Sequence, residues 1–240
     1  MTDMTSAFSF GGALEDVASL DTFDSALFYG PAGGGKTMLA ASGIAAGFGN
    51  VLLVDIEGSA KGIGRIYPGV KRMKAFNFTD LEFIKAELLQ KAVGNVDLIL
   101  FDTLNAGAKL AVNHFKNLPQ NRSNKFGAWD DLQLWVNDWM RSFHALDVPV
   151  IFTGHAMNEK NDQTGSILTM PKMQGSAKED VPTIPDIVGY LTAENVNGKM
   201  ERVLYTGLAE GLVTKNRFGL PDKIVNPSLK LINELIEDAK

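Results

Sequence analysis

The sequence predicts an α/β fold built on a mostly parallel, twisted sheet with helices on both faces. Short continuous apolar runs alternate with longer segments of helical period, which is the order expected of a parallel sheet. A glycine-rich loop joins the first apolar run to the first helical segment, and polar residues end the later runs. Because ligands bind at the carboxyl ends of parallel strands, the loop and these polar residues predict one shared site.

The first strand is expected over residues 25–29, directly before the loop. Residues 1–24 show no clear period, so we expect a flexible lead-in followed by one domain over residues 25–240. An alanine-rich helix is expected after the loop, from Met38 to Ala46. The next run, Val51–Asp55, has the continuous apolar character of a buried parallel strand.

The later elements continue this alternation. They are a helix over 79–93 with Thr79 as its cap, a strand over 96–101, a helix over 129–146, a strand over 148–153, strands near 202–205 and 211–214, and a closing helix over 229–236. Residues 156–185 are polar and lack a clear period, which indicates a long functional loop. The tryptophans of the 129–146 helix follow its apolar face, and we interpret them as core residues.

Composition excludes several classes of protein. The chain has 240 residues, no cysteine and a formal net charge of −5. Disulfides and thiolate zinc sites are therefore excluded, and a cytoplasmic location is expected. No apolar run reaches the roughly 20 residues of a membrane span, and the N-terminus does not resemble a signal peptide. The acidic balance argues against a uniformly basic nucleic-acid binder but is compatible with a local basic groove.

Residues 30–37 carry the pattern G-x-x-x-x-G-K-T, which binds nucleotide phosphates when it lies between a strand and a helix. The glycines let the backbone wrap a polyphosphate with its N–H groups pointing inward. Lys36 is expected to reach the β- and γ-phosphates of ATP, and the Thr37 hydroxyl is expected to bind Mg²⁺. The residues expected to contact the nucleotide are Gly30, Pro31, Ala32, Gly33, Gly34, Gly35, Lys36, Thr37 and Met38.

Two carboxylates follow neighbouring apolar runs. Asp102 closes the run 97–102, and an apolar strand that ends in aspartate is the pattern that holds Mg²⁺ opposite a phosphate loop. Glu57 follows the run 51–55, and strand alternation would place it on the same side as Asp55. There it could activate the water that attacks the γ-phosphate. A turn or cap role for Asp102 and a cap or surface role for Glu57 are the alternatives.

Three further polar residues could serve the same reaction. His155 follows the strand 148–153 and could hydrogen-bond the γ-phosphate, although a histidine satisfied in the core fits the pattern equally well. Lys215 and Arg217 flank one residue, so in an extended segment both side chains face the same way. Such a pair could reach a phosphate bound by a neighbouring subunit, as arginine fingers do. A solvated turn would explain the same charges.

A basic segment lies within this acidic chain. No acidic residue occurs from Thr103 to Trp129, and Phe115 and Phe126 lie among its cations. Cations neutralise a phosphate backbone and exposed aromatic rings stack on unpaired bases, so the segment could bind single-stranded DNA. A solvated helix and loop is the alternative. Together with three lysines from 156–185, the candidate DNA-binding residues are Lys109, Lys116, Arg122, Lys125, Lys160, Lys172 and Lys178.

In their order along the chain, these pieces resemble the RecA-type recombinase ATPases over residues 25–225. The resemblance implies a RecA-like P-loop core in which Glu57 activates water, His155 acts as the sensor and segment 156–185 binds DNA. RecA itself has glutamine at the sensor position.

The segment Lys-Asn-Arg-Phe-Gly at 215–219 is similar to a signature of the bacterial RadA repair ATPases. This similarity implies that Lys215 and Arg217 contact ATP across a subunit interface. The chain has neither the cysteines nor the length for the additional RadA domains. In size and layout it resembles the compact RecA-like ATPases encoded by bacteriophages, which act with single-strand annealing and single-strand binding proteins.

We therefore expect a Mg²⁺-dependent ATPase that assembles on single-stranded DNA as a homo-oligomer, with ATP at the subunit interface, in recombination or repair. A nucleotide-dependent loader or remodeller of a protein partner, without DNA binding, is the alternative. The acidic net charge and the near-neutral segment 156–185 favour that alternative. A small-molecule kinase is a third hypothesis, but the sequence has no convincing lid or acceptor-site pattern.

Overall fold

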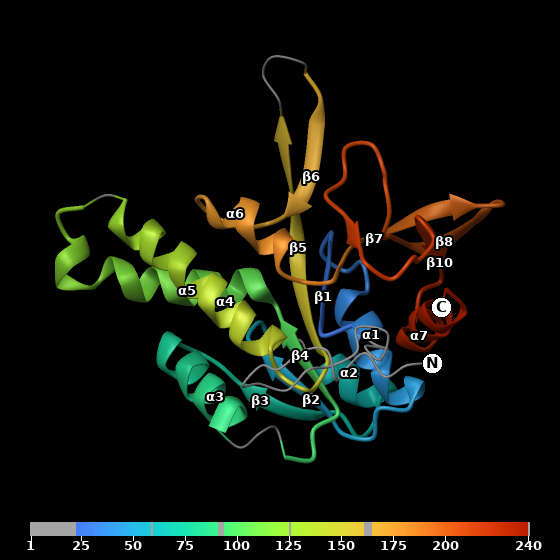
Figure 1. Cartoon of the computed structure of the whole chain (residues 1–240), viewed down its shortest axis with the longest axis horizontal. Coiled ribbons are helices and arrows are strands. Elements are labelled where there is room, and N and C mark those ends of the chain that lie inside the picture. The colour runs from blue at the N-terminus through green and yellow to red at the C-terminus, as the bar shows by residue number, and fades with distance from the viewer. Residues whose placement is uncertain (1–22, 59, 91–93, 125, 161–164, 240) are drawn as a thin grey trace, which may run out of the picture.

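The computed structural model of the chain describes residues 23–58, 60–90, 94–124, 126–160 and 165–239 (Figure 1). Residues 1–22 of the predicted lead-in lie outside the described residues, and so does Lys125.

The described elements alternate between strands and helices along the chain. The strands are β1 (Ser25–Gly30), β2 (Val51–Asp55), β3 (Lys71–Lys74), β4 (Leu98–Asp102), β5 (Val150–Lys160), β6 (Ile167–Pro171), β7 (Ile187–Val196), β8 (Lys199–Tyr205), β9 (Lys215–Asn216) and β10 (Lys223–Val225). The α-helices are α1 (Lys36–Ala41), α2 (Ala60–Ile66), α3 (Phe78–Gln90), α4 (Leu104–Lys116), α5 (Gly127–His144), α6 (Ala177–Asp180) and α7 (Leu229–Asp238). Short 3₁₀ helices are η3 (Ser42–Ala46), η4 (Pro119–Asn121) and η5 (Val181–Thr183). Within the described residues, no helix combines the length and apolar character that crossing a lipid bilayer requires.

The strands form a sheet in the order β10-β8-β7-β1-β5-β4-β2-β3, with β6 paired to β5 and β9 paired to β7. The strands from β7 to β3 in this order run parallel, whereas β8 and β10 are antiparallel additions at one edge. The register pairs Gly30 with His155 and Asp55 with Asp102. The mostly parallel sheet predicted from the sequence is confirmed, and the polar residues at the strand ends lie along its carboxyl edge.

Helices cover both faces of the sheet because the central strands bury side chains on both sides. In β1, Leu27 and Tyr29 belong to a core packed by α3, α4 and α5, whereas Ala26 and Phe28 belong to a core packed by α1, α2 and α7. Side chains alternate faces along a strand, so one continuous apolar run supplies both cores. Figure 1 shows the two groups of helices on opposite sides of the strands.

The predicted start of the helix over 79–93 is wrong, because the helix begins before Thr79. Helix α3 begins at Phe78, and the residue that caps it is Asn77 rather than Thr79. Asn77 Oδ1 accepts a hydrogen bond from Asp80 N at 3.0 Å, and the Asp80 carboxylate accepts from the N–H groups of Phe76 and Asn77. The side chains of Asn77 and Asp80 thus accept hydrogen bonds from backbone N–H groups that would otherwise lack a partner at the start of the helix.

The region after β5 also differs from its prediction. Residues 156–185 are not a long loop, because β5 continues to Lys160 and pairs antiparallel with β6. The resulting hairpin projects from the body of the molecule (Figure 1). The strand predicted over 211–214 is absent, since Gly211 has φ of +72° and turns the chain; strand β9 begins only at Lys215.

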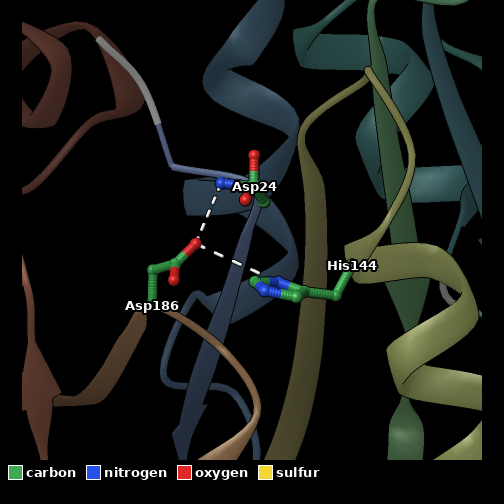
Figure 2. Close-up of side chains that lie close together, drawn as sticks. All are labelled: Asp24, His144 and Asp186. Carbon is green, nitrogen blue, oxygen red and sulfur yellow. Dashed lines mark hydrogen bonds and ion pairs between the residues drawn. The ribbon is translucent and has the colours of Figure 1, made fainter. Parts of the chain in front are cut away.

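A buried aspartate ties the amino ends of β1 and β7 together. Asp186 Oδ2 accepts a hydrogen bond from the backbone N–H group of Asp24 at 2.9 Å (Figure 2). It also accepts one from the backbone N–H group of Ser25 at 3.3 Å. His144 Nδ1 lies 2.8 Å from Ser25 Oγ and 4.0 Å from Asp186 Oδ2. Asp186 Oδ1 accepts from Arg217 Nη1 at 2.7 Å. Because protein donors engage both carboxylate oxygens, we interpret this cluster as structural.

Tyr29 links the strand before the phosphate loop to the hairpin. Its buried hydroxyl lies within hydrogen-bonding distance of two carbonyl oxygens, Thr169 O on β6 (3.0 Å) and Val213 O (2.9 Å). Burial raises the pKa of the Tyr29 phenol well above its usual range, so the hydroxyl remains a donor near neutral pH.

We expect Tyr29→Phe to lower the free energy of unfolding by about 1–2 kcal/mol, because the two carbonyl groups lose their donor. Denaturant titration followed by circular dichroism measures the change. Tyr67→Phe is the control, since Tyr67 is half-buried and its hydroxyl has no hydrogen-bond partner within the described ranges. Equal stability of Tyr29→Phe and the wild type would contradict the link.

Candidate active site

The phosphate loop leaves β1 at Gly30 and enters α1 at Lys36. Gly33 and Gly35 have φ of +74° and +95°, a left-handed conformation that glycine adopts without steric penalty. At Gly30 a Cβ atom would lie 2.1 Å from the carbonyl oxygen of Leu191, so only glycine fits beside β7. Gly35 is the N-cap of α1 and has no side-chain oxygen, which leaves the first N–H groups available to a phosphate. The loop therefore fits a polyphosphate.

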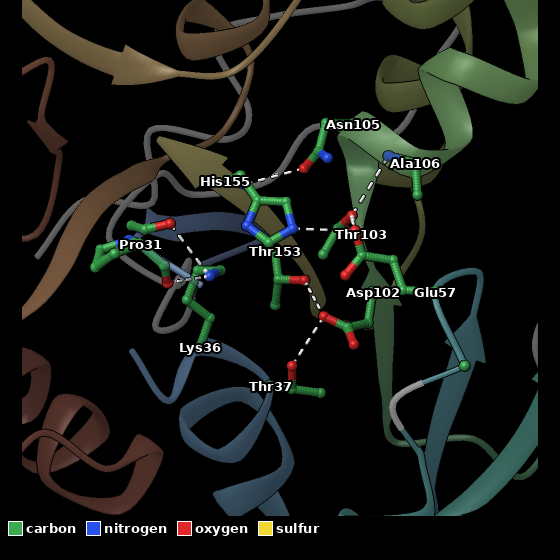
Figure 3. A network of polar contacts seen from close by, with 12 residues as sticks. Pro31, Lys36, Thr37, Glu57, Asp102, Thr103, Asn105, Ala106, Thr153 and His155 are labelled. Atoms are coloured by element: carbon green, nitrogen blue, oxygen red, sulfur yellow. Dashed lines mark hydrogen bonds and ion pairs between the residues drawn. The ribbon is translucent and has the colours of Figure 1, made fainter. Parts of the chain in front are cut away.

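Lys36 lies buried at this loop, with 5% of its surface exposed. Its Nζ donates hydrogen bonds to Gly30 O at 3.2 Å and to Pro31 O at 2.8 Å (Figure 3). Burial lowers the pKa of Lys36, and the nearby charges of Asp102 and Glu57 oppose that shift. A bound phosphate would favour the charged amine further. The amine is thus held where the predicted phosphate contact can form.

Asp102 ends β4 opposite the start of α1 and is almost fully buried. Its Oδ1 accepts hydrogen bonds from Thr37 Oγ1 at 2.9 Å and from Thr153 Oγ1 at 2.5 Å (Figure 3). Hydroxyl and carboxylate oxygens are the ligands that Mg²⁺ prefers, usually with several waters retained. Thr37 and Asp102 therefore fit the predicted magnesium site, where the ion would polarise phosphate oxygens and offset the buried carboxylate.

Glu57 and His155 meet on the other side of Asp102. Glu57 Oε1 accepts a hydrogen bond from Thr103 Oγ1 at 2.9 Å and lies 3.0 Å from His155 Nε2 (Figure 3). The backbone N–H groups of Ile56 and Glu57 lie 2.8 and 3.3 Å from Asp102 O, which fixes the chain as it leaves β2. The carboxylate is thus oriented by two side chains, as a group that positions an attacking water should be.

Asp55 does not share this position, so the predicted common side of Asp55 and Glu57 is wrong. Strand β2 ends at Asp55 and the chain bends at once, so the alternation of side chains stops there. The Asp55 carboxylate pairs with Arg72 Nε at 3.0 Å and accepts from Gly58 N at 2.7 Å.

These side chains line a cavity of about 450 Å³ at the carboxyl edge of the sheet. The predicted residues that line it are Ala32, Gly33, Gly35, Lys36, Thr37, Met38, Glu57, Asp102 and His155. The other predicted loop residues, Gly30, Pro31 and Gly34, shape the loop from behind. We call this space the nucleotide cavity.

Sequence reasoning missed four polar residues around the nucleotide cavity. Thr153 holds Asp102 and Thr103 holds Glu57. In the sequence Thr103 directly follows the strand-end Asp102, whereas Thr153 is a single hydroxyl after an apolar run. Asn105 Oδ1 accepts a hydrogen bond from His155 N at 2.9 Å, which the sequence separation of fifty residues conceals. Arg202 lines the cavity from β8 and belongs to no motif.

A second cavity, of about 640 Å³, borders the first. Three of the candidate DNA-binding residues line it, namely Lys109 and Lys116 on α4 and Lys172 after β6. Lys116 Nζ lies 4.7 Å from the centre of the Trp129 ring, which packs partly against the core and also lines this cavity. Glu57 lines it as well. We call this space the lysine cavity.

The remaining DNA-binding candidates lie elsewhere. Arg122 is exposed and follows η4, and Lys160 is exposed at the end of β5. Lys178 is half-buried, and its Nζ pairs with both carboxylate oxygens of Glu159 at 2.7 and 2.8 Å. Lys125 lies outside the part of the chain that the structure describes. The structure thus gathers only part of the predicted set into one cavity.

Lys215 and Arg217 lie at the opposite edge of the sheet from the phosphate loop. Lys215 pairs with Val188 at the beginning of β7, beside the beginning of β1. Its Nζ donates to Thr183 O at 2.6 Å, while Arg217 pairs with the buried Asp186. Neither side chain lines the nucleotide cavity of its own chain.

Comparison with known proteins gives one family match and a similar solved structure. A family model described as an AAA domain matches residues 23–218. Among solved structures, a KaiC-like protein from the hyperthermophilic archaeon Pyrococcus horikoshii OT3 is similar, with 18% identity and a TM-score of 0.44. The similarity covers 75% of this chain and 76% of that chain. None of the curated proteins matches the chain.

We expect Glu57→Gln to lower the rate of ATP hydrolysis at least about 100-fold, because the amide cannot accept a proton from water. ATP binding should change less than about threefold, since Lys36 and Thr37 remain in place. Hydrolysis assays and titration with a fluorescent ATP analogue measure the two quantities. Glu179→Gln, at an exposed carboxylate on α6, is the control. A Glu57→Gln enzyme with near wild-type turnover would refute the assignment.

Proposed function

The chain belongs to the AAA domain family, and we propose that it is a Mg²⁺-dependent ATPase whose turnover depends on assembly along single-stranded DNA. The family match, the parallel sheet and the phosphate loop confirm the P-loop ATPase core of RecA-like type that the sequence predicts. The proposal also includes the DNA partner, the oligomer and a role in recombination or repair. It further includes a phage origin, a cytoplasmic location and a single-strand annealing or binding protein as a partner.

One observation supports coupling to DNA most directly: Glu57 lines both the nucleotide cavity and the lysine cavity. The proposed water-activating carboxylate therefore lies between the space proposed for the nucleotide and the space proposed for DNA. A polyanion in the lysine cavity would alter the electrostatic surroundings of Glu57 without entering the nucleotide cavity.

The lining of the lysine cavity suits a single DNA strand. Three lysines face it, and Glu57 is the carboxylate among its described lining residues. Lysines neutralise phosphates, while the amide groups of Asn113 and the ring of Trp129 offer hydrogen bonding and stacking to an unpaired base. Double-stranded DNA would present its bases less readily to such a recess.

Backbone contacts connect the two cavities further. Lys172 N donates a hydrogen bond to His155 O at 2.7 Å, and Asn105, which lines the lysine cavity, binds His155 N. The His155 ring in turn contacts Glu57. A strand held by Lys172 and α4 would therefore act on the same residue that orients the carboxylate. This path supports the proposed sensor role of His155.

The location of Lys215 and Arg217 supports an interface role. Lys215 pairs with the beginning of β7, whose residues there pair in turn with Ala26 and Leu27 of β1. Gly30 lies three to four residues further along β1, about 10–13 Å at the usual strand rise. The loop itself extends beyond Gly30, and neither cation lines the nucleotide cavity of its own chain, which supports a role at the triphosphate site of a neighbouring subunit.

The first test compares ATP hydrolysis with and without single-stranded DNA while assembly is followed by light scattering. We expect stimulation of roughly tenfold or more, together with oligomer formation in ATP. Lys109→Ala and Lys172→Ala should reduce stimulation and lower the salt dependence of DNA binding by about one phosphate contact each. Lys230→Ala, at an exposed lysine of α7, is the control. An equal rate with and without DNA, from a protein that stays monomeric, would favour the protein-loader alternative.

The second test mixes two inactive variants. Arg217→Ala should bind ATP but lose turnover, and mixing it with Glu57→Gln should restore part of the activity, because some interfaces then join an intact Glu57 to an intact Arg217. A mixture of Glu57→Gln with Lys36→Ala is the control, since both changes lie in the same nucleotide cavity and no interface becomes complete. Lack of recovery in the first mixture, despite normal assembly, would exclude action across subunits.

A further inference from the structure

We propose that Arg202 binds the polyphosphate of the nucleotide held in the cavity of its own chain, as a second cation beside Lys36. The inference rests on the proposed function, because it takes the nucleotide cavity as the ATP site. No motif contains Arg202, and its position emerges only from the packing of β8 against the phosphate loop.

The guanidinium lies directly over the loop. A Cβ atom added to Gly35 would come within 2.6 Å of Arg202 Nε and 3.1 Å of its Cζ. Arg202 also lines the nucleotide cavity with Lys36 and Thr37. A side chain at Gly35 would therefore displace the arginine, which gives this glycine a role beyond its positive φ.

The sheet explains why an arginine reaches this point. Arg202 pairs with Ala193 of β7 and lies on the same face of β8 as Leu204, two residues later. Leu204 belongs to the core under α1 and α7. The side chain two positions earlier therefore points along that face toward the start of α1, where the phosphate loop ends.

The charge of Arg202 has no partner among the residues that the structure describes. No described carboxylate or other acceptor pairs with its guanidinium. By contrast, Lys199 pairs with Glu201 at 2.9 Å on the same strand, and Lys223 of β10 pairs with Glu194 of β7 at 2.7 Å. The main chain of Arg202 is held independently, since its carbonyl accepts from Asn226 N at 2.7 Å. The side chain can therefore change without loss of the strand.

The electrostatic balance of the cavity favours a phosphate ligand for this cation. Glu57 and Asp102 contribute two carboxylates, and Lys36 alone would leave the described lining with a net negative charge. Arg202 brings the lining to balance before Mg²⁺ binds. A planar guanidinium also matches a phosphate in a bidentate geometry, which a lysine at this position would not.

The test measures binding in isolation from hydrolysis. Wild type, Arg202→Ala and Arg202→Lys are titrated with a fluorescent ATP analogue, which is then displaced by ATP or by inorganic tripolyphosphate in Mg²⁺. We expect Arg202→Ala to raise the Kd of both competitors about tenfold or more, and Arg202→Lys to raise it less. Lys199→Ala, on the same strand, should stay within about twofold of wild type. Thermal melts verify that each variant is folded.

Two outcomes would overturn the proposal. If Arg202→Ala weakens ATP but leaves tripolyphosphate unchanged, the arginine contacts the base or ribose instead. If neither competitor changes, it is a surface residue. Titration of dilute, monomeric protein must show the same loss, because the contact is within one chain. Failure of the proposed function is distinct: wild type would then not bind ATP, or Lys36→Ala would bind it equally well.

Discussion

The fold of the site depends on Asp102, whose side chain and main chain together join three other segments. Its carboxylate accepts from Thr37 at the start of α1 and from Thr153 on β5, and its carbonyl lies within reach of the N–H groups at the end of β2. The Asp102 carboxylate is almost fully buried, and burying a carboxylate is costly unless hydrogen bonds or a cation compensate it. If Mg²⁺ binds at Asp102 as proposed, the residue that would hold the metal is also the residue that aligns these segments.

From this centre the structure extends an uninterrupted path to a second cavity. Glu57 is fixed by Thr103 and His155, and the main chain of His155 is held by Asn105 and Lys172. Each of these contacts is a hydrogen bond, which a ligand in either cavity could strengthen or break. Coupling requires that both cavities bias one element with two arrangements, and the side chain of His155 is the described residue best placed to be that element. Its ring is partly exposed and adjoins the carboxylate that would act on water.

The parts of this site that depend on local geometry could be predicted from the sequence. The phosphate loop needs glycines within eight residues, and Asp102 and His155 follow directly from apolar strands, so their neighbourhood could be predicted from parallel pairing alone. Asn77 and the hairpin of β5 and β6 were missed because a cap and a polar strand pair depend on partners that carry no apolar period. Arg202 and Asn105 could not be predicted from the sequence. Each lies on an element whose position in or against the sheet is set by tertiary packing, and a single polar residue forms no sequence pattern.

The cations at the two ends of the parallel strands are held in different ways. The carboxyl edge has an electrostatically balanced pocket, if Arg202 acts as proposed, while the amino edge holds Arg217 on the buried Asp186 with about half of its side chain exposed. A guanidinium has five N–H donors in a rigid plane, so the ion pair to Asp186 orients it without consuming its capacity to bind a second anion. Because Asp186 is anchored to the first residues of β1, the orientation of Arg217 is fixed before any partner arrives, which lowers the entropy cost of contact. The ion pair thus ties Arg217 to the structural cluster around Asp186, and the exposed half of its side chain is the part that the proposed interface role would use.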